Sequence, residues 1–361
     1  MVGSKEIRIR RNCYDKDYKK ELFIAAILLI YVLSMNDIIW ANTDEKQTDN
    51  QNFTQSISHK YNLTEEEQKG LETFTQDQQE EVEQMLRTNR QAVEITYNLS
   101  ELDEVGEIRK LSEATIEELQ NSGMSLEEAQ NVKQEIKEIE SKTIEVISEE
   151  YKCSTTDAKM LQNAVKVNNS KNIDGFKDID YKNKCSASGS ISAKKMATSM
   201  VKYDNSKKVK GKRKNADYEI LVHYQWKSDP MFVASSDRIA CAWGGGLNIT
   251  TKKVESTYRY YNPSKSRYIF VNKTPSKDEK PNKGIIYTFP QKYSKGTIYS
   301  AYARFRLYQG TFKNYSTKAI SNYAHRIIKV TGGSISITGT PGISIGSGFD
   351  KSKQVSQGLL R

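Results

Sequence analysis

Two apolar runs in close succession constrain the fold of this 361-residue chain more than any other stretch. They read YEILVHYQW over residues 218–226 and MFVASSDRIACAW over residues 231–243, and both are rich in β-branched and aromatic side chains. A polar turn over residues 227–230 separates them, and its Pro230 excludes a helix through the join. We therefore expect residues 218–243 to form the central hairpin of a β domain.

Further short runs of the same kind follow and precede this stretch, separated by turn-forming Asn, Pro, Ser and Lys residues. Many short strands without alternating helices favour a sandwich or an open barrel over βαβ units. The sequence thus predicts about ten short antiparallel strands in a C-terminal all-β sandwich, a basic domain over residues 185–349. The tail over residues 350–361 is expected to be disordered. The other runs are 190–203, 247–260, 268–271, 285–289, 298–308, 318–330, 334–338 and 343–346.

Residues 60–167 carry helix signals instead. A Ser or Thr followed three residues later by Glu or Gln is the spacing of a capping box, and apolar residues recur at three- and four-residue steps. We expect a small bundle of helices with a solvated acidic exterior, although the stripe over 125–150 also fits a short coiled-coil seam. The fold class is therefore α+β, with a flexible linker over 42–59 and a connector over 168–184. The capping pairs are Thr64 with Glu67, Thr75 with Gln78, Thr115 with Glu118, and Ser125 with Glu128.

Charge divides the chain in the same way. Residues 42–150 carry 27 acidic and 10 basic side chains, a net charge of −17, whereas residues 151–361 carry a net charge of +25. Such asymmetry concerns partners rather than fold. It suggests that the acidic helical region is an intramolecular mask, which covers the basic domain until a stronger polyanion displaces it.

The N-terminus has the features of an export signal. Seven basic residues precede the fourteen-residue apolar run at 22–35, which is the length of a secretory h-region and shorter than a membrane span of about 20 residues. We expect a signal peptide over residues 1–41, cut after Ala41, or an uncleaved anchor at 22–41. The protein would then be secreted or associated with the cell surface. The long basic n-region and the Lys- and Asn-rich composition are typical of a Gram-positive bacterium.

Three cysteines would remain after cleavage. Export permits a disulfide, and Cys153 with Cys185 is the preferred pair because both flank the domain boundary in polar sequence. Cys241, inside the apolar IACAW, is interpreted as a buried residue. Three free thiols are the alternative, since sequence alone does not define pairing.

A basic segment at 207–214 marks the candidate polyanion-binding site. No acidic residue lies between Asp204 and Asp217, and on an exported chain such a segment indicates contact with an anionic cell-wall polymer, an anionic membrane surface or another polyanion. The alternative is a solubilising hairpin tip. The candidate cations are Lys207, Lys208, Lys210, Lys212, Arg213, Lys214, Arg259 and Arg304.

Tyrosines interleave with the cations. Sixteen lie between residues 151 and 323, and on a sheet face they could stack on sugars or bases while cations hold phosphates. The competing interpretation is that they are ordinary half-buried strand residues. The candidates for aromatic contact are Tyr258, Tyr260, Tyr261 and Tyr302.

Residues 332–349 alternate isoleucine with Ser or Thr around a Gly-Thr-Pro-Gly turn. A pore former uses such a hairpin, but each arm is shorter than the 9–11 residues that a membrane strand needs, which favours a hairpin that covers the sandwich core. The alternative function that this pattern supports is a secreted, membrane-active toxin or bacteriocin-like protein with a helical pro-region.

Catalysis has little support. His223 or His325 with Asp237 and with Cys241 or a serine is the only set to consider, and no recognised catalytic, cofactor-binding or metal-binding motif accompanies it. We expect a non-enzymatic protein without cofactor or metal. A hydrolase of wall or glycan that uses His223 or His325 is a third hypothesis.

Overall fold

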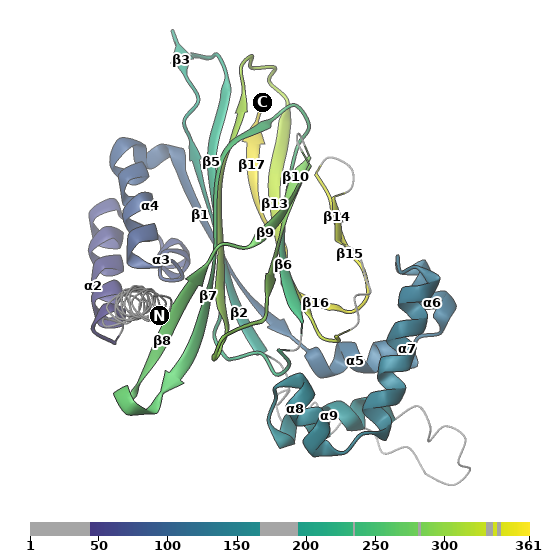
Figure 1. Ribbon diagram of the computed structural model, residues 1–361. Coiled ribbons are helices and arrows are strands. Elements are labelled where there is room, and N and C mark those ends of the chain that lie inside the picture. Colours follow the sequence, from purple (N-terminus) through teal and green to yellow (C-terminus); the bar gives the residue numbers. More distant parts are fainter. Residues whose placement is uncertain (1–43, 167–193, 234, 281–282, 330–334, 338–340) are drawn as a thin grey trace, which may run out of the picture. The chain divides into compact units, whose positions relative to one another are not determined.

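The computed structural model describes residues 44–166, 194–233, 235–280, 283–329, 335–337 and 341–361. It confirms the predicted fold class, because helices precede an antiparallel β-sandwich (Figure 1). The main compact unit spans Thr48–Tyr260 and Phe270–Arg361, and Tyr261–Ile269 belong to a second unit. The expected signal peptide and the connector at 168–184 lie outside the described residues. Within those residues, no helix is both long and apolar enough to cross a membrane.

The capping boxes predicted from the sequence are present. Thr64, Thr75, Thr115 and Ser125 each cap a helix, and each exchanges hydrogen bonds with the Glu or Gln three residues on. The helices are α2 (Asp44–Tyr61), α3 (Glu65–Leu71), α4 (Gln76–Asn89), α5 (Glu104–Glu113), α6 (Ile116–Asn121), α7 (Leu126–Ser141), α8 (Ile144–Tyr151) and α9 (Thr155–Lys166).

Helix α2 corrects the prediction of a flexible linker over residues 42–59. Phe53, Ile57 and Tyr61 recur every four residues, which places them on one helical face. Ile57 is buried, and Phe53 and Tyr61 are partly buried against the same apolar cluster. Contacts with the rest of the chain therefore hold this segment as a helix. Its polar composition gave no indication of those contacts.

Strand β1 (Val93–Leu102) interrupts the helical region and was missed. It pairs antiparallel with β2 (Lys194–Asp204) in a ten-pair register from Val93↔Tyr203 to Leu102↔Lys194. Its β-branched and aromatic residues fit this pairing, with Val93 and Ile95 buried. The predicted boundary between a helical domain and a separate β domain is therefore wrong, because β1 lies in the predicted helical domain and pairs with β2 of the predicted β domain.

The sandwich has two sheets. Among the described residues the first has the order β1-β2-β5-β12-β7-β8, with β11 beside β12, and the second has the order β16-β13-β6-β10-β9, with β17 beside β13. The remaining bounds are β5 (Ala216–Trp226), β6 (Ser236–Trp243), β7 (Asn248–Asn262), β8 (Arg267–Lys273), β9 (Ser276–Lys280), β10 (Gly284–Pro290), β11 (Lys292–Tyr293), β12 (Gly296–Gln309), β13 (Ser316–Arg326), β16 (Phe349–Lys351) and β17 (Val355–Leu360).

The expected central hairpin over residues 218–243 is wrong, because β5 and β6 belong to different sheets. The chain between them crosses the sandwich, and its Met231 and Phe232 are buried among helices. Both strands are apolar because both are buried along almost their whole length, with Trp226 and Trp243 fully enclosed. A sequence pattern shows that burial but not which sheet each strand joins.

Helices and strands share two apolar clusters. Helices α2–α4 cover part of the first sheet, where Ile57, Phe74 and Leu86 meet Leu221 and Tyr302 (Figure 1). Helices α5–α9 surround a second cluster that contains Met231, Phe232, Ile327 and Ile328. An apolar contact of this kind does not detach when a polyanion arrives, so the packing argues against the helical region as a displaceable mask.

The tail predicted to be disordered is strand β17. It pairs with β13 over Val355–Leu360, and Val355 and Leu359 are buried. Alternation of buried and exposed side chains along VSQGLL is the pattern of a strand with one buried face. The β-sandwich therefore extends beyond residue 349.

Candidate functional site

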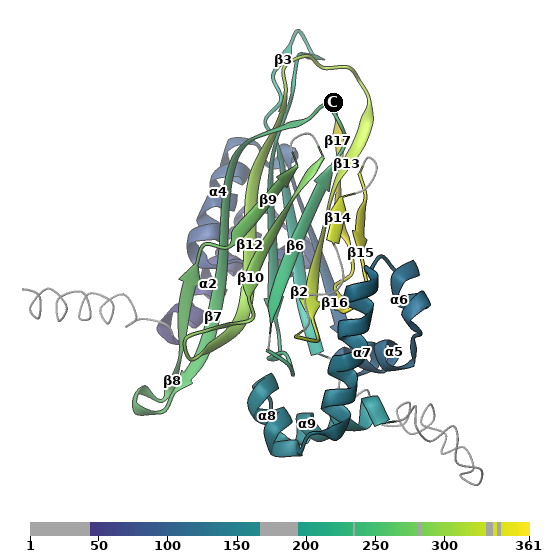
Figure 2. The same ribbon diagram turned by 45° about the vertical axis from the view of Figure 1, so that its right-hand side comes forward.

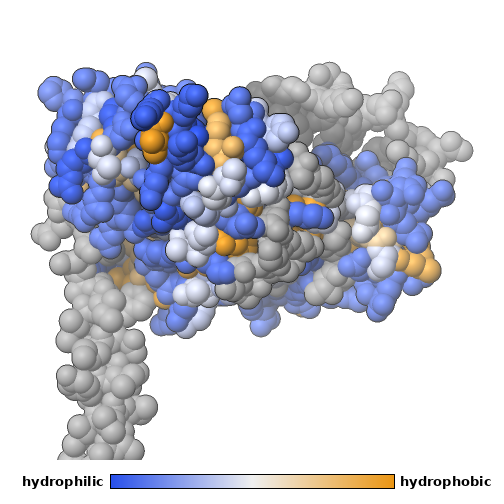
Figure 3. Space-filling view, turned by 90° about the horizontal axis from the view of Figure 1, so that it is seen from above, coloured by the Kyte–Doolittle hydropathy of each residue, from blue (hydrophilic) through white to orange (hydrophobic). Residues whose placement is uncertain are grey.

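Five exposed lysines gather on one short hairpin, β3 (Lys208–Val209) and β4 (Lys212–Arg213), between the end of β2 and the start of β5. The turn has Lys210 and Gly211 in the left-handed region, with φ of 49° and 74°. Figure 3 looks down on this end of the sandwich, which is largely hydrophilic. The lysine end, as we call it, consists of the exposed residues Lys207, Lys208, Lys210, Lys212 and Lys214.

The carboxylates beside the lysine end are already paired with arginines. Arg213 forms a two-pronged ion pair with Asp204, and Arg306 Nε donates to Asp217 Oδ1 at 2.7 Å. Among the residues that the structure describes, none of the five lysine ammonium groups has a carboxylate within 4.0 Å. The hairpin therefore presents positive charge that nearby acids do not neutralise.

Arg213 differs from the lysines, although the sequence placed it in the same candidate site. Its Nη1 donates to Ser206 Oγ at 2.9 Å and to Tyr218 Oη at 2.7 Å. The guanidinium also lies over the rings of Tyr218 and Phe312, at 5.8 Å and 5.4 Å from their centroids. These contacts anchor the base of the hairpin, so Arg213 positions the lysines.

Arg259 and Arg304 do not join the lysine end as free cations. Arg304, on β12, pairs with Glu219 on β5 and, at 2.9 Å, with Glu81 on α4. Arg259 pairs with Asp229 at 2.6 Å and stacks on the Tyr299 ring at 4.7 Å. The sequence suggested surface cations, but both arginines form ion pairs with acids distant in the chain and so connect separate elements of the fold.

The four candidate tyrosines are not gathered on one face. Tyr258 and Tyr302 are buried, and their hydroxyls donate to the Pro290 carbonyl at 2.8 Å and to Glu81 Oε2 at 3.0 Å. Tyr260 is half-buried. Tyr261 is 52% exposed and stacks edge-on against Tyr268 within the second unit. For Tyr258 and Tyr302 the structure favours the interpretation as strand residues.

Two tyrosines that sequence reasoning missed flank the loop beside the lysine end, Tyr308 near the end of β12 and Tyr315 just before β13. Tyr315 is 59% exposed and Tyr308 is 37% exposed. Between them, the backbone N–H of Phe312 donates to the Lys214 carbonyl at 3.0 Å, which ties this loop to the hairpin. The Arg361 guanidinium lies 5.6 Å from the Tyr315 ring centroid. The available signal was the polar, turn-forming sequence around Tyr315, where no strand buries a ring.

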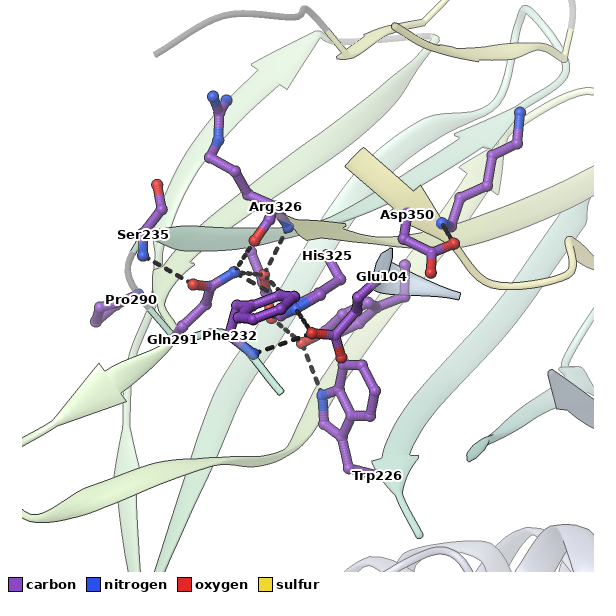
Figure 4. A network of polar contacts seen from close by, with 12 residues as sticks. Glu104, Trp226, Phe232, Ser235, Pro290, Gln291, His325, Arg326 and Asp350 are labelled. Atoms are coloured by element: carbon purple, nitrogen blue, oxygen red, sulfur yellow. Dashed lines mark hydrogen bonds and ion pairs between the residues drawn. The ribbon is translucent and has the colours of Figure 1, made fainter. Parts of the chain in front are cut away.

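The catalytic candidates His325 and Asp237 do meet, in a fully buried network. Figure 4 shows this network around His325, Gln291 and Arg326. His325 Nδ1 lies 3.0 Å from Asp237 Oδ1, and Gln291 Nε2 donates to the same oxygen at 2.7 Å. The Tyr323 hydroxyl donates to Asp237 Oδ2, and the Arg326 backbone N–H donates to Oδ1 at 3.1 Å. Saturation of the carboxylate by these partners fits a structural ion pair.

The network reaches the helical region through Glu104, the first residue of α5. Glu104 accepts backbone N–H groups from Met231 at 2.9 Å and from Phe232 at 3.0 Å, and its Oε2 lies 3.7 Å from His325 Nε2. Burial alone would lower the pKa of His325, but Asp237 and Glu104 outweigh it and raise that pKa to about 10. A charged imidazole thus joins the helical region to the sandwich.

The other candidate groups are separate from this network. His223 packs against Phe74 and Tyr302, and burial lowers its pKa to about 3. Cys241 is buried, as expected, and burial raises the pKa of its thiol to about 12. Cys153 has no disulfide partner among the described residues, and Cys185 lies outside them, so their pairing stays a prediction. In the same part of the chain, no group of three His, Cys, Asp or Glu side chains could hold a metal ion.

Comparison with known proteins gives no family. No family model and no curated protein matches the chain. Solved structures give partial overlaps with low scores. The collagen-binding subdomain ACE19 of the Enterococcus faecalis surface protein ACE covers 42% of this chain and 92% of its own, at 7% identity and a TM-score of 0.21. The collagen-binding domain of a Staphylococcus aureus adhesin covers 44% of this chain and 97% of its own, at 9% identity and a TM-score of 0.21.

A toxin overlaps equally weakly. The Clostridium perfringens NetB toxin in its membrane-inserted form covers 46% of this chain and 91% of its own, at 7% identity and a TM-score of 0.20. TM-scores of this size carry no argument about fold or function. The fold class therefore stands on the strands and helices of the chain itself.

Proposed function

We propose that this is a non-enzymatic, extracellular binding protein whose lysine end holds an anionic polymer of the cell wall. The observation that supports the proposal is the unneutralised charge on the hairpin, where five exposed lysines stand beside two carboxylates that arginines already occupy. Lysine is a flexible point charge and suits a polymer of repeating anions better than one shaped ligand.

The anchored base makes this hairpin more than a solubilising tip. Arg213 holds it to Asp204, Ser206 and Tyr218, so the lysines project from a defined position. Clustered charges of one sign concentrate a counter-charged partner, and the attraction falls with salt because the Debye length is about 8 Å at physiological ionic strength.

A pore-forming role has less support. Hairpin β14–β15 has arms of three residues each, Ile335–Ile337 and Ile343–Ile345, and its isoleucines contact Ala240, Ile286 and Ala324 of the second sheet. A membrane strand needs about 9–11 residues. The hairpin contacts favour the interpretation in which it covers the sandwich.

The test replaces the five lysines of the lysine end with glutamine and measures binding to polyphosphate over a range of salt concentrations. A matched control replaces five other exposed lysines, Lys137, Lys159, Lys292, Lys295 and Lys318, which gives the same change in net charge. We expect loss of binding only in the first variant. Equal weakening in both would mean that net charge alone acts, and that outcome overturns the site. Vesicles of phosphatidylglycerol and phosphatidylcholine form a second arm that distinguishes a lipid surface from a polymer.

A further inference from the structure

A cleft of about 430 Å³ lies where β13, β15 and the turn between β16 and β17 meet. Its lining includes Asn322, Ile343, Ile345, Lys351, Ser352 and Lys353. The volume falls within the range of about 300–1,000 Å³ that is typical of small-molecule sites. Figure 2 shows β14 and β15 beside β13 and β16, the elements that frame this part of the molecule.

One wall of the cleft is apolar. Ile343 and Ile345 are two residues apart on β15, so both side chains lie on the same face of the strand. They pack at the margin of the cluster that contains Ala240, Ile286 and Phe349, and each remains only half-buried. Two partly exposed isoleucines that line a cleft give it an apolar surface that an alkyl chain could cover.

The turn between β16 and β17, which carries the two lysines of the cleft, is held in place by hydrogen bonds. Lys351 and Lys353 flank the buried Ser352, whose hydroxyl accepts the Tyr323 backbone N–H at 3.0 Å and whose carbonyl accepts from Asn322 Nδ2 at 3.1 Å. The Lys353 backbone N–H donates to Ser100 Oγ of β1 at 2.8 Å. The turn is thus fixed from two strands, so the cleft is formed before any ligand arrives.

Both lysines are exposed, and no carboxylate lines the cleft. In the described part of the chain, neither ammonium group has a carboxylate within 4.0 Å. A pair of cations facing a pair of isoleucines matches a molecule that is anionic at one end and apolar at the other.

We propose that this cleft binds an amphiphilic anion, an alkyl chain that carries a carboxylate or a phosphate. Lys351 and Lys353 contact the anionic group, and Ile343 and Ile345 contact the alkyl chain. The site is distinct from the lysine end, and the proposal does not rest on polyanion binding.

Chain length provides the first test, in the unaltered protein. Calorimetric titration with hexanoate, octanoate and decanoate below their micelle concentrations should show affinity that rises by up to about fourfold for each methylene that leaves water. Decyl phosphate should bind as decanoate does, whereas acetate and decanol should each bind at least tenfold more weakly than decanoate. An affinity that does not change with chain length would overturn the proposal.

Variants provide the second test. Lys351→Gln with Lys353→Gln should reduce decanoate binding at least tenfold while decanol binding is unchanged, and Ile345→Trp should fill the cleft and abolish both. Lys292→Gln with Lys295→Gln, two exposed lysines of the β11 turn, is the matched control and should bind as the unaltered protein does. Thermal melting shows which variants are folded. Ile343→Trp fills the same wall if Ile345→Trp does not fold, and normal binding by a folded wall variant would show that decanoate binds elsewhere.

Discussion

The imidazole of His325 lies between two buried carboxylates, with Nδ1 3.0 Å from Asp237 Oδ1 and Nε2 3.7 Å from Glu104 Oε2. Asp237 belongs to the second sheet, whereas Glu104 begins a helix of the acidic region. One charged ring therefore connects parts of the chain that differ in composition and in net charge.

This arrangement predicts that stability falls in alkaline solution. The pKa of His325 rises from 6.5 to about 10 on folding, so its contribution is complete below about pH 6.5 and is lost as the pH rises toward 10. Urea titrations across this range should give a falling free energy of unfolding, and His325→Gln should flatten that decline. His59→Gln, at an exposed position, should leave the slope unchanged. A slope that persists in His325→Gln would contradict the assignment.

Glu104 predicts a second effect on stability. Glu104→Gln removes a buried negative charge and leaves charged His325 with Asp237 alone, and loss of one partner of a buried ion pair costs about 3–5 kcal/mol. Equilibrium unfolding at neutral pH should show a loss of that order. Glu101→Gln, three residues earlier and exposed, should cost under about 0.5 kcal/mol. Similar stability of the two variants would mean that the network does not support the fold.

Arg213 tests the difference between charge and position in the lysine end. Arg213→Lys keeps the charge but loses the two-pronged contact with Asp204, because an ammonium group cannot reproduce the planar fork. We expect weaker polyphosphate binding in a folded protein with all five lysines in place. Lys212→Arg on the same hairpin should bind normally, since Lys212 is exposed. Unchanged binding by Arg213→Lys would remove the positioning role.

Tyr315 predicts selectivity among polyanions. An exposed ring beside cations can stack on a sugar ring, so Tyr315→Ala should lower affinity for a sulfated polysaccharide about fivefold, or about 1 kcal/mol. Binding to polyphosphate, which has no rings, should be unchanged. Tyr261→Ala is the control, because Tyr261 is comparably exposed but belongs to the second unit. Equal losses on both polymers would contradict a stacking role.

The shared clusters predict that the two regions do not fold alone. A fragment that contains residues 194–361 lacks β1 and the helices whose apolar residues pack with Leu221 and Tyr302. We expect it to aggregate or to remain expanded by circular dichroism and gel filtration, whereas co-expression with residues 44–166 should restore a folded complex. A cooperative melt of the isolated fragment would show that the sandwich is independent after all.

Local patterns in the sequence predicted local structure well. Capping at Thr64 or Ser125 depends on residues three apart, and the composition of apolar strands such as β12 is enough to predict them. Association between distant strands was not accessible in this way. β5 and β6 are both apolar because both face a core, and only the fold decides that they face it from opposite sheets.

The candidate site shows the same limit. The five lysines are adjacent in sequence, so their proximity was predictable, whereas the partners of Arg304 come from Glu81 and Glu219 far along the chain. Tyr302 was predicted as an aromatic contact because tyrosines interleave with cations along this stretch, yet helix α4 covers it. Whether a strand residue is exposed, and whether its charge is paired, depends on the elements that pack over it. Composition does not show which elements those are.

The long pairing of β1 with β2 also has a consequence for biosynthesis. A ribosome makes the N-terminal helices well before the β2, β5 and β12 residues that complete their apolar contacts. Those helices must wait, incompletely buried, until most of the polypeptide has emerged. The chain therefore gains its full stability only once its last strands have been made.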